Sequence, residues 1–443
     1  GCDTIIHQYP CHAKHIIVSY RDQLFSVPVY DVHGQRMSPG TIKQQLQELM
    51  ATTSQLSEPE PPIGVLTTEN RDTWAEVRSH LEANPANKHN LEAIDSSLFM
   101  LCLDDAGVDS SMIHDKDKLA NHLLHAGNGR NRWYDKSFQV IVLNTGQAGC
   151  NGEHSPVDAL TTGRICMDAI LAEETPEYAS PFVTAKSGSN VEKPKLLRWS
   201  VDSRVRQAIE VAEVQAVRMA QSIHLRLGEV AGLGSDYIKK AKVSPDAFVQ
   251  MALQLAYYRL HGQPCATYET ASTRAFLHGR TETIRSCSSE SLAFTKAFDD
   301  PDVPARKKAE LLARAVAAHL EYMKAASQGK GVDRHLLGLR TQLQSDEERA
   351  RAQLLSDPAF SRSCDFKMST SNVSAGCYFR GGFAPVSHDG YGINYGIDKD
   401  NISFSISQWD GSKQTNAEQM HQLLSKSLLD LRDLAEYTLS RVS

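Results

Sequence analysis

Two periods of hydrophobic and polar residues divide the first half of the chain into predicted strands and helices. Short runs rich in β-branched and aromatic residues, typical of strands, are His15–Tyr20, Leu24–Tyr30, Phe99–Leu103 and Phe138–Leu143. The tripeptide Arg21-Asp22-Gln23 separates the first two runs, which predicts a β-hairpin. Apolar residues at helical spacing predict helices from Ser38-Pro39 to Met50 and from Asp72 to Leu81. Because strands alternate with helices, the pattern favours an α/β fold in layers.

The second half is predicted to be mostly helical, with strands returning near the C-terminus. A long helix is expected at about 202–223, and Ser244-Pro245 opens another that continues through Tyr258. Further helices are expected at 305–327 and 334–355, and strands at 364–370, 391–396 and 402–408. Thr415 and Glu418 are spaced as a capping box before a final amphipathic helix.

A chain of 443 residues is too long for one ordinary hydrophobic core, so two domains are expected. Residues 185–194 are rich in Ser, Gly, Lys and Pro, which is typical of a connection. We therefore predict one domain at 1–197 and a second at 198–443.

Composition narrows the class of protein. The net charge of −6 gives no overall basic field for nucleic acid, and no apolar run is long enough to span a bilayer. Nine cysteines without a CxxC pair indicate reduced thiols rather than a disulfide framework or a zinc site, so no metal is expected. The start Gly1-Cys2-Asp3 has no signal-peptide pattern, and the C-terminal Ser443 does not complete a recognised peroxisomal signal. We expect an intracellular protein, with the mitochondrial, peroxisomal and cytosolic compartments left open.

His154 is the first candidate for chemistry. Acyl transfer to a hydroxyl needs a base for the hydroxyl proton, and histidine suits neutral pH. His154 is followed four residues later by Asp158, and if Pro156 began a helix the two would share one side of its first turn. By itself this HxxxD spacing is weak, because a lone histidine is more often structural.

The surroundings of His154 change its interpretation. The segment Gly129–Lys136, an apolar strand and then Glu153–Asp158 together resemble the signature of the carnitine/choline acyltransferases. The resemblance implies two chloramphenicol-acetyltransferase-like α/β domains, each a mixed sheet packed with helices, with an active-site tunnel between them. It implies His154 as the catalytic base, aided by Asp158, and coenzyme A as co-substrate with no permanently bound cofactor. Because the resemblance starts at about residue 3, inside the family's first domain, we expect an N-terminally truncated chain whose own activity is open.

A second cluster suits a carboxylate ligand. Thr281 and Thr283 are two residues apart, so on a strand their hydroxyls share one side. A nearby arginine would supply the opposite charge. Within the resemblance, Tyr268, Thr281 and Thr283 match positions that hold the carnitine carboxylate, and Arg334 matches its partner. Choline has no carboxylate, so these residues favour L-carnitine over choline.

Two further segments match the reacting end of the substrates. In Ser369-Thr370-Ser371, the resemblance implies that Ser371 donates to the oxyanion, with Asn372 standing where the family usually has Gln. In the run 378–383, expected as a strand, Phe383 matches an aromatic residue near the trimethylammonium group. Gly381 stands where short-chain enzymes carry a bulky residue, so medium or long acyl chains are expected to enter; a simple glycine bulge is the alternative.

The coenzyme A half needs cations for phosphates. Lys239 and Lys242 belong to a lysine run just before Asp246, in a Ser-Pro-Asp-Ala-Phe segment that matches the family's coenzyme A motif. Ser235 stands where the family commonly has another lysine, which puts one phosphate contact in doubt. A solvated lysine face is the alternative for the run.

The predicted function is reversible transfer of a medium- or long-chain acyl group between coenzyme A and L-carnitine, as expected in fatty acid metabolism. The protein is expected to act as a monomer, with L-carnitine and acyl-CoA as its partners. The alternative is a non-catalytic relative that binds or regulates, and a choline acyltransferase is disfavoured by Arg334 and the threonine pair.

Overall fold

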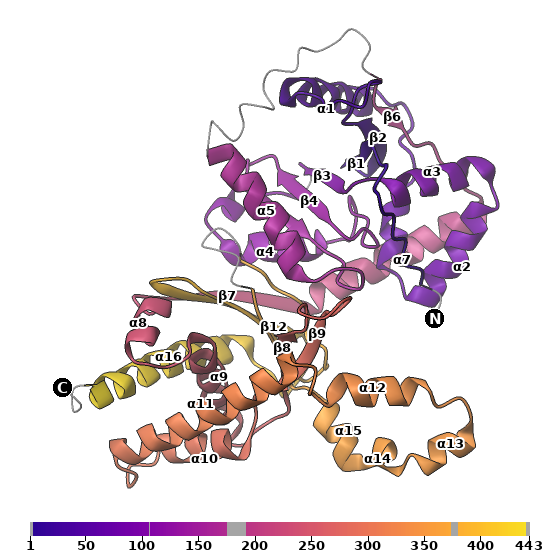
Figure 1. Cartoon of the computed structure of the whole chain (residues 1–443). Helices are drawn as coiled ribbons and strands as arrows, with labels where there is room; N and C mark the ends of the chain where they lie inside the picture. Colours follow the sequence, from indigo (N-terminus) through magenta and orange to yellow (C-terminus); the bar gives the residue numbers. More distant parts are fainter. Residues whose placement is uncertain (1–2, 106, 175–191, 374–379, 440–443) are drawn as a thin grey trace. The chain divides into compact units, whose positions relative to one another are not determined.

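The computed structural model describes residues 3–105, 107–174, 192–373 and 380–439 (Figure 1). Contacts divide the chain into two compact units, 1–222 and 223–443. The predicted domain boundary, after Leu197, lies 25 residues before the division between the two units at Ser222. The reason is that helix α7 (Ser203–Gln221) packs on the first unit through η1 (Ile63–Thr68) and α2 (Arg71–Glu82). Most of the expected connection at 185–194 falls outside the described residues.

The first unit is a six-stranded mixed sheet with strand order β5-β4-β3-β1-β2-β6. The central pairs β1–β3 and β3–β4 are parallel, whereas β1–β2, β4–β5 and β2–β6 are antiparallel. Its strands are β1 (His15–Tyr20), β2 (Gln23–Pro28), β3 (Met100–Asp104), β4 (Gln139–Leu143), β5 (Ala148–Asn151) and β6 (Lys195–Leu196). Its other helices are α1 (Pro39–Ser54), α3 (Pro85–Ser96), η2 (Ser110–Ile113), α4 (Lys116–His125) and α5 (Ala159–Glu174). The predicted hairpin and the strands and helices of this half are confirmed to within a few residues.

A buried ionic cluster joins the segment 129–136 to the sheet. The Arg132 guanidinium donates to both carboxylate oxygens of Asp104, at 2.9 and 2.7 Å, and the side chain of Arg132 is fully buried. His122 lies 2.7 Å from the same carboxylate, and Asn131 donates to it. Burial alone would raise the pKa of Asp104, but the hydrogen bonds from His122 and Arg132 hold it well below its usual range. Part of the predicted signature is therefore a structural anchor.

Replacing Arg132 by Met should lower the free energy of unfolding by about 3 kcal/mol, because it leaves the Asp104 carboxylate buried without its cation. Arg130→Met is the matched control, since Arg130 is partly exposed and pairs with Asp22 and Glu213 near the surface. Chemical denaturation of both variants measures the difference. Equal losses would contradict the anchoring role of Arg132.

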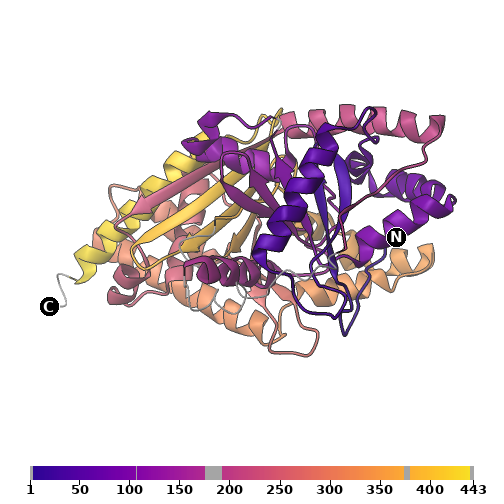
Figure 2. The ribbon, with the colours of Figure 1, turned by 90° about the horizontal axis from the view of Figure 1, so that it is seen from above.

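The second unit is also a six-stranded mixed sheet, with strand order β7-β12-β11-β10-β8-β9. Its strands are β7 (Ile223–Ala231), β8 (Thr267–Ser272), β9 (Thr281–Arg285), β10 (Met368–Asn372), β11 (Tyr391–Ile397) and β12 (Asn401–Trp409). Figure 2 shows β12 alongside β7, with which it pairs antiparallel along its length. The two described sheets confirm the mixed α/β class.

Long helices cover one face of the second sheet, and short helices flank it. The helices are α8 (Ser235–Lys240), α9 (Pro245–His261), α10 (Ser289–Phe298), α11 (Ala305–Ser327), α12 (Asp333–Thr341), α13 (Asp346–Arg351), α14 (Gln353–Ser356), α15 (Pro358–Cys364) and α16 (Ala417–Leu439). Figure 1 shows α9, α11 and α16 together beneath the strands, and α12 to α15 as a separate group beyond β9. Helix α9 begins with Pro245, whose fixed φ suits a first turn, and stops at Gly262 with φ 67°. No helix among the described residues is long and apolar enough to cross a membrane.

Strand register gives the second sheet one apolar and one polar face. Ile393 and Ile406 are register partners on the apolar face, where they join α9 and α16 in the main core. Residues one position along face the other way, because side chains alternate on a strand. Through the register of β8, β9, β10, β11 and β12 this polar face carries Tyr268, Thr281, Thr283, Ser369, Ser371, Asn394, Ser403, Ser405 and Ser407.

Four predictions of secondary structure are wrong in detail. The strand expected at 364–370 lies at 368–372, because α15 continues to Cys364. The helix expected at 334–355 is broken into α12, α13 and α14, and Ser345 caps α13. Asn416 rather than Thr415 caps α16, since its Oδ1 accepts from the Gln419 amide at 2.9 Å. Residues 380–383 form no strand, and 378–379 lie outside the described residues.

Candidate active site

His154 lies in an exposed turn between β5 and α5. Its Nδ1 is 3.7 Å from Asp158 Oδ1, and the imidazole is 69% exposed, compared with 16% for the carboxylate. The turn is held by Glu153, whose carboxylate accepts from the amide and hydroxyl of Ser155 at 2.7 and 2.8 Å. The condition of a helix beginning at Pro156 is not met, because α5 begins at Ala159. Asp158 therefore stands just before the helix and still faces His154.

Arg334, Tyr268 and Thr281 come together at the edge of the second sheet. Arg334 Nη2 donates to Tyr268 Oη at 3.1 Å and to Thr281 Oγ1 at 3.2 Å, and Nε lies 3.3 Å from the Thr281 carbonyl oxygen. Both hydroxyl oxygens act as acceptors here, so each keeps its own proton for donation. A guanidinium beside two O–H donors is an arrangement suited to one carboxylate.

Thr283 and Ser371 face the same side of the sheet as this cluster. Thr283 is two residues from Thr281 on β9, and its buried Oγ1 makes no hydrogen bond within the described part of the chain. Ser371 lies on β10 in register with Asn394, whose side chain donates to the Ser371 carbonyl oxygen at 3.3 Å. The sheet thus gathers Tyr268, both threonines and Ser371 on its polar face.

A pair that the sequence pattern did not reveal positions Arg334. Arg285 at the end of β9 donates to both oxygens of Asp333 at 3.0 and 2.7 Å. Asp333 is the first residue of α12 and Arg334 the second, so this bidentate contact fixes the start of α12 against the strand. The Glu282 carboxylate adds to this by accepting from the Arg334 amide. The adjacent opposite charges of Asp333 and Arg334 were the feature of the sequence that could have indicated this arrangement. Their partners Arg285 and Thr281, however, lie about fifty positions earlier in the chain.

The segment with Gly381 and Phe383 crosses the polar face of the sheet. Ser405 Oγ donates to the Gly381 carbonyl oxygen at 2.8 Å, and Ser407 Oγ donates to that of Phe383 at 2.6 Å. A Cβ at residue 381 would lie 3.3 Å from Asn394 Oδ1. A larger side chain there would therefore point towards the register partner of Ser371.

The predicted coenzyme A residues are of two kinds. Lys239 and Lys242 are exposed, at the end of α8 and just beyond it. Asp246 in the first turn of α9 is instead part of a network, since its Oδ1 accepts from Tyr395 Oη at 2.6 Å and from Asn372 Nδ2 at 2.9 Å. Asn372 thereby links the end of the Ser371 strand to the lysine-containing segment.

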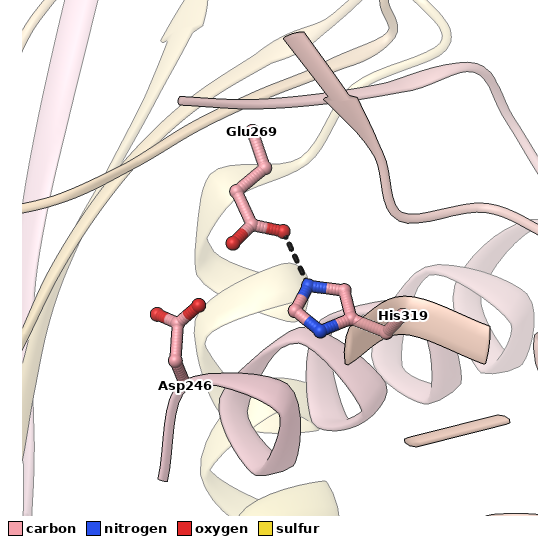
Figure 3. Close-up of side chains that lie close together, drawn as sticks. All are labelled: Asp246, Glu269 and His319. Atoms are coloured by element: carbon pink, nitrogen blue, oxygen red, sulfur yellow. Dashed lines mark hydrogen bonds and ion pairs between the residues drawn. The ribbon is translucent and has the colours of Figure 1, made fainter. Parts of the chain in front are cut away.

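Behind Asp246 lies a buried pair that the sequence pattern did not indicate. His319 Nε2 on α11 is 2.7 Å from Glu269 Oε2 on β8, and both side chains are almost fully buried. Figure 3 shows these two side chains pointing at each other, with the Asp246 carboxylate beside them. Potential ligand atoms of the three lie within 4.8 Å of one another, close enough for one divalent cation. The hydroxyl groups of Ser286 and Tyr395 already donate to the two carboxylates.

This pair should make stability fall with rising pH. Burial raises the pKa of Glu269 to about 7, although His319 opposes the rise. Burial lowers the pKa of His319, but the contact with Glu269 outweighs it and leaves that pKa raised. Both groups hold protons to higher pH in the folded state, so the free energy of unfolding should fall, by about 3 kcal/mol, between Glu269's ordinary 4.5 and about 7.

Glu269→Gln should flatten this pH dependence, because a glutamine oxygen still accepts from Ser286 and His319 without titrating. Glu229→Gln, an exposed change on β7, should retain the wild-type profile. Denaturation between pH 5 and 8 measures both variants. An unchanged slope in Glu269→Gln would contradict the assignment.

Comparison with known proteins identifies the class. The model of the "Choline/Carnitine o-acyltransferase" family matches residues 1–426, which is nearly the whole chain. The protein is therefore an acyltransferase. It belongs to the choline/carnitine O-acyltransferase family.

Relatives of both kinds are similar to it. Carnitine O-acetyltransferase of Rattus norvegicus is 37% identical over 427 residues, covering 95% of this chain and 67% of the relative. Choline O-acetyltransferase of Gallus gallus is 34% identical over 442 residues, covering 98% and 68%. A chloramphenicol acetyltransferase structure matches 48% of this chain and 88% of its own, at 9% identity and a TM-score of 0.26.

Proposed function

We propose that the protein is a carnitine O-acyltransferase that moves an acyl group reversibly between coenzyme A and L-carnitine. The observation that carries the proposal is the convergence of Arg334, Tyr268 and Thr281 through hydrogen bonds of 3.1 and 3.2 Å. This cluster suits a carboxylate, which carnitine has and choline lacks. The similarity to a carnitine O-acetyltransferase at 37% identity supports the same substrate.

His154 is proposed as the general base. It takes the proton from the carnitine hydroxyl, whose oxygen attacks the thioester carbonyl, and the oxyanion accepts a hydrogen bond from Ser371. Collapse breaks the C–S bond, and the leaving thiolate of coenzyme A takes the proton from His154. The exposed imidazole can meet a substrate, and Asp158 Oδ1 lies 3.7 Å from its Nδ1. In reverse, His154 takes the proton of the thiol.

The other residues are proposed to place the two substrates. Thr283 adds a third hydroxyl for the carboxylate, and Phe383 offers a ring face to the trimethylammonium group. Lys239 and Lys242 pair with phosphates of coenzyme A, and Asp246 helps to position the coenzyme.

Turnover with carnitine and with choline tests the proposal directly. Thiol release from acetyl-, octanoyl- and palmitoyl-coenzyme A is followed with each acceptor at equal concentration. We expect kcat/KM for carnitine to exceed that for choline at least a hundredfold, since choline cannot use the Arg334 cluster. Equal or greater turnover with choline would overturn the substrate assignment.

We also propose that medium or long acyl chains are accepted, because Gly381 presents no side chain towards Asn394. Gly381→Met should then lower kcat/KM for octanoyl- and palmitoyl-coenzyme A at least tenfold while changing that for acetyl-coenzyme A little. Acetyl-coenzyme A serves as the control within the same preparation. Wild-type activity confined to acetyl-coenzyme A, as the names of the relatives would suggest, would refute the longer-chain proposal.

A further inference from the structure

Two cysteines flank the turn that carries His154. Cys150 is on β5 and Cys166 on α5, and their Sγ atoms are 3.8 Å apart. Both side chains are partly exposed, so a small oxidant in solution can reach them. The turn with His154 and Asp158 lies in the chain between them. A bond between the two sulfurs would close a loop around the turn.

We infer that Cys150 and Cys166 form a thiol pair that hydroperoxides convert to a disulfide, and that this disulfide slows acyl transfer. The second half of the inference rests on the proposed role of His154. A disulfide needs sulfurs about 2 Å apart, so rotation of the two side chains and a small shift of α5 towards β5 must close the present gap. The His154 turn is covalently joined to both elements and must shift with them.

The chemistry balances with one hydroperoxide. A thiolate of the pair attacks the peroxide oxygen, forming an S–O bond, breaking the O–O bond and releasing water or an alcohol. The second thiol attacks the sulfenic sulfur, forming the S–S bond as water leaves. Two thiols lose two electrons, which the hydroperoxide gains, and a dithiol reductant reverses the change.

The local electrostatics favour this pair over the buried cysteines. The hydrogen bond between the two sulfurs lowers the pKa of Cys166 to about 7 despite partial burial. Burial instead raises the pKa of Cys102 and of Cys265 to about 12, which keeps both as unreactive thiols. Cys11 is exposed and has no thiol contact among the described residues, so it serves as the comparison for access alone.

Peptide mapping after mild hydrogen peroxide treatment tests the disulfide without reference to activity. Trypsin cleaves after Arg164, so Cys150 and Cys166 fall on different peptides and a disulfide links them. We expect the linked peptide in wild type and in Cys11→Ser, and its loss in Cys150→Ser, in Cys166→Ser and after dithiothreitol. Oxidation of Cys11 without any linked peptide would overturn the thiol pair.

Measurement of kcat for acyl transfer on the same samples tests whether the disulfide slows the reaction. We expect kcat to fall about tenfold in oxidised wild type and Cys11→Ser and to recover with dithiothreitol, while Cys166→Ser keeps its activity under peroxide. A linked peptide with unchanged kcat would overturn the control of activity. If the wild type shows no acyltransferase activity even with its thiols reduced, that result would count against the proposed function. The peptide map would still decide whether the disulfide forms.

Discussion

Replacing His154 by alanine should lower kcat for acyl transfer about a thousandfold while changing the KM values for carnitine and acyl-coenzyme A less than threefold. The reason is that alanine removes the group proposed to take the hydroxyl proton, a contribution of about 100- to 10,000-fold in general base catalysis. Because the imidazole is 69% exposed, its removal should leave the fold intact. Thiol release under saturating substrates measures kcat.

His89→Ala is the matched control, since His89 is also exposed and lies on α3 of the same unit. It should retain wild-type turnover. The base assignment fails if His154→Ala keeps more than a tenth of the wild-type kcat. Equal losses of kcat in both variants would point to a loss of folded protein instead.

Replacing Arg334 by Asn should raise the KM for carnitine about a hundredfold and leave that for acyl-coenzyme A within a factor of two. Asparagine is too short to reach Tyr268 Oη and Thr281 Oγ1, and it carries no charge for a carboxylate. Hydrogen bonds to a charged group contribute about 1.5 to 3 kcal/mol, which corresponds to this loss. Initial rates at varied carnitine and fixed acyl-coenzyme A measure the change.

Arg340→Asn is a control on the same helix, because Arg340 is exposed near the C-terminal end of α12. It should leave both KM values unchanged. Equal weakening of carnitine and coenzyme A in Arg334→Asn would contradict a role in holding the carboxylate. Unchanged use of choline by the same variant would strengthen that role, since choline has nothing for Arg334 to bind.

Local features were predictable from the sequence because their causes are local. The hairpin at 15–28 follows from two runs of β-branched and aromatic residues around a short turn, and Arg21 and Asp22 adopt positive φ values in that turn. Helix α9 follows from Pro245 at its start and a dense apolar sequence. Element ends were less predictable, since Thr415 and Asn416 could both cap α16, and it is Asn416 whose Oδ1 accepts from the Gln419 amide.

Contacts between distant segments were not predictable from a single chain. Glu269 and His319 are 50 positions apart, and Arg285 and Asp333 are 48 apart. The spacing of residues along a chain gives no information on contacts of this length, because they depend on how helices pack on the sheet. The contact of Arg132 with Asp104 is another example. The segment 129–136 was recognised as part of the family signature, but its sequence did not show that Arg132 anchors it to the sheet.

The sequence by itself determined the kind of chemistry available and the family signature around His154, because residue types and short spacings are properties of the chain. Only the tertiary structure decided which of these groups meet. The register of the second sheet placed Tyr268, Thr281 and Ser371 on one polar face, and the Arg285–Asp333 pair brought Arg334 to it. A shift of one residue in that register would turn these side chains to the apolar face, since strand side chains alternate.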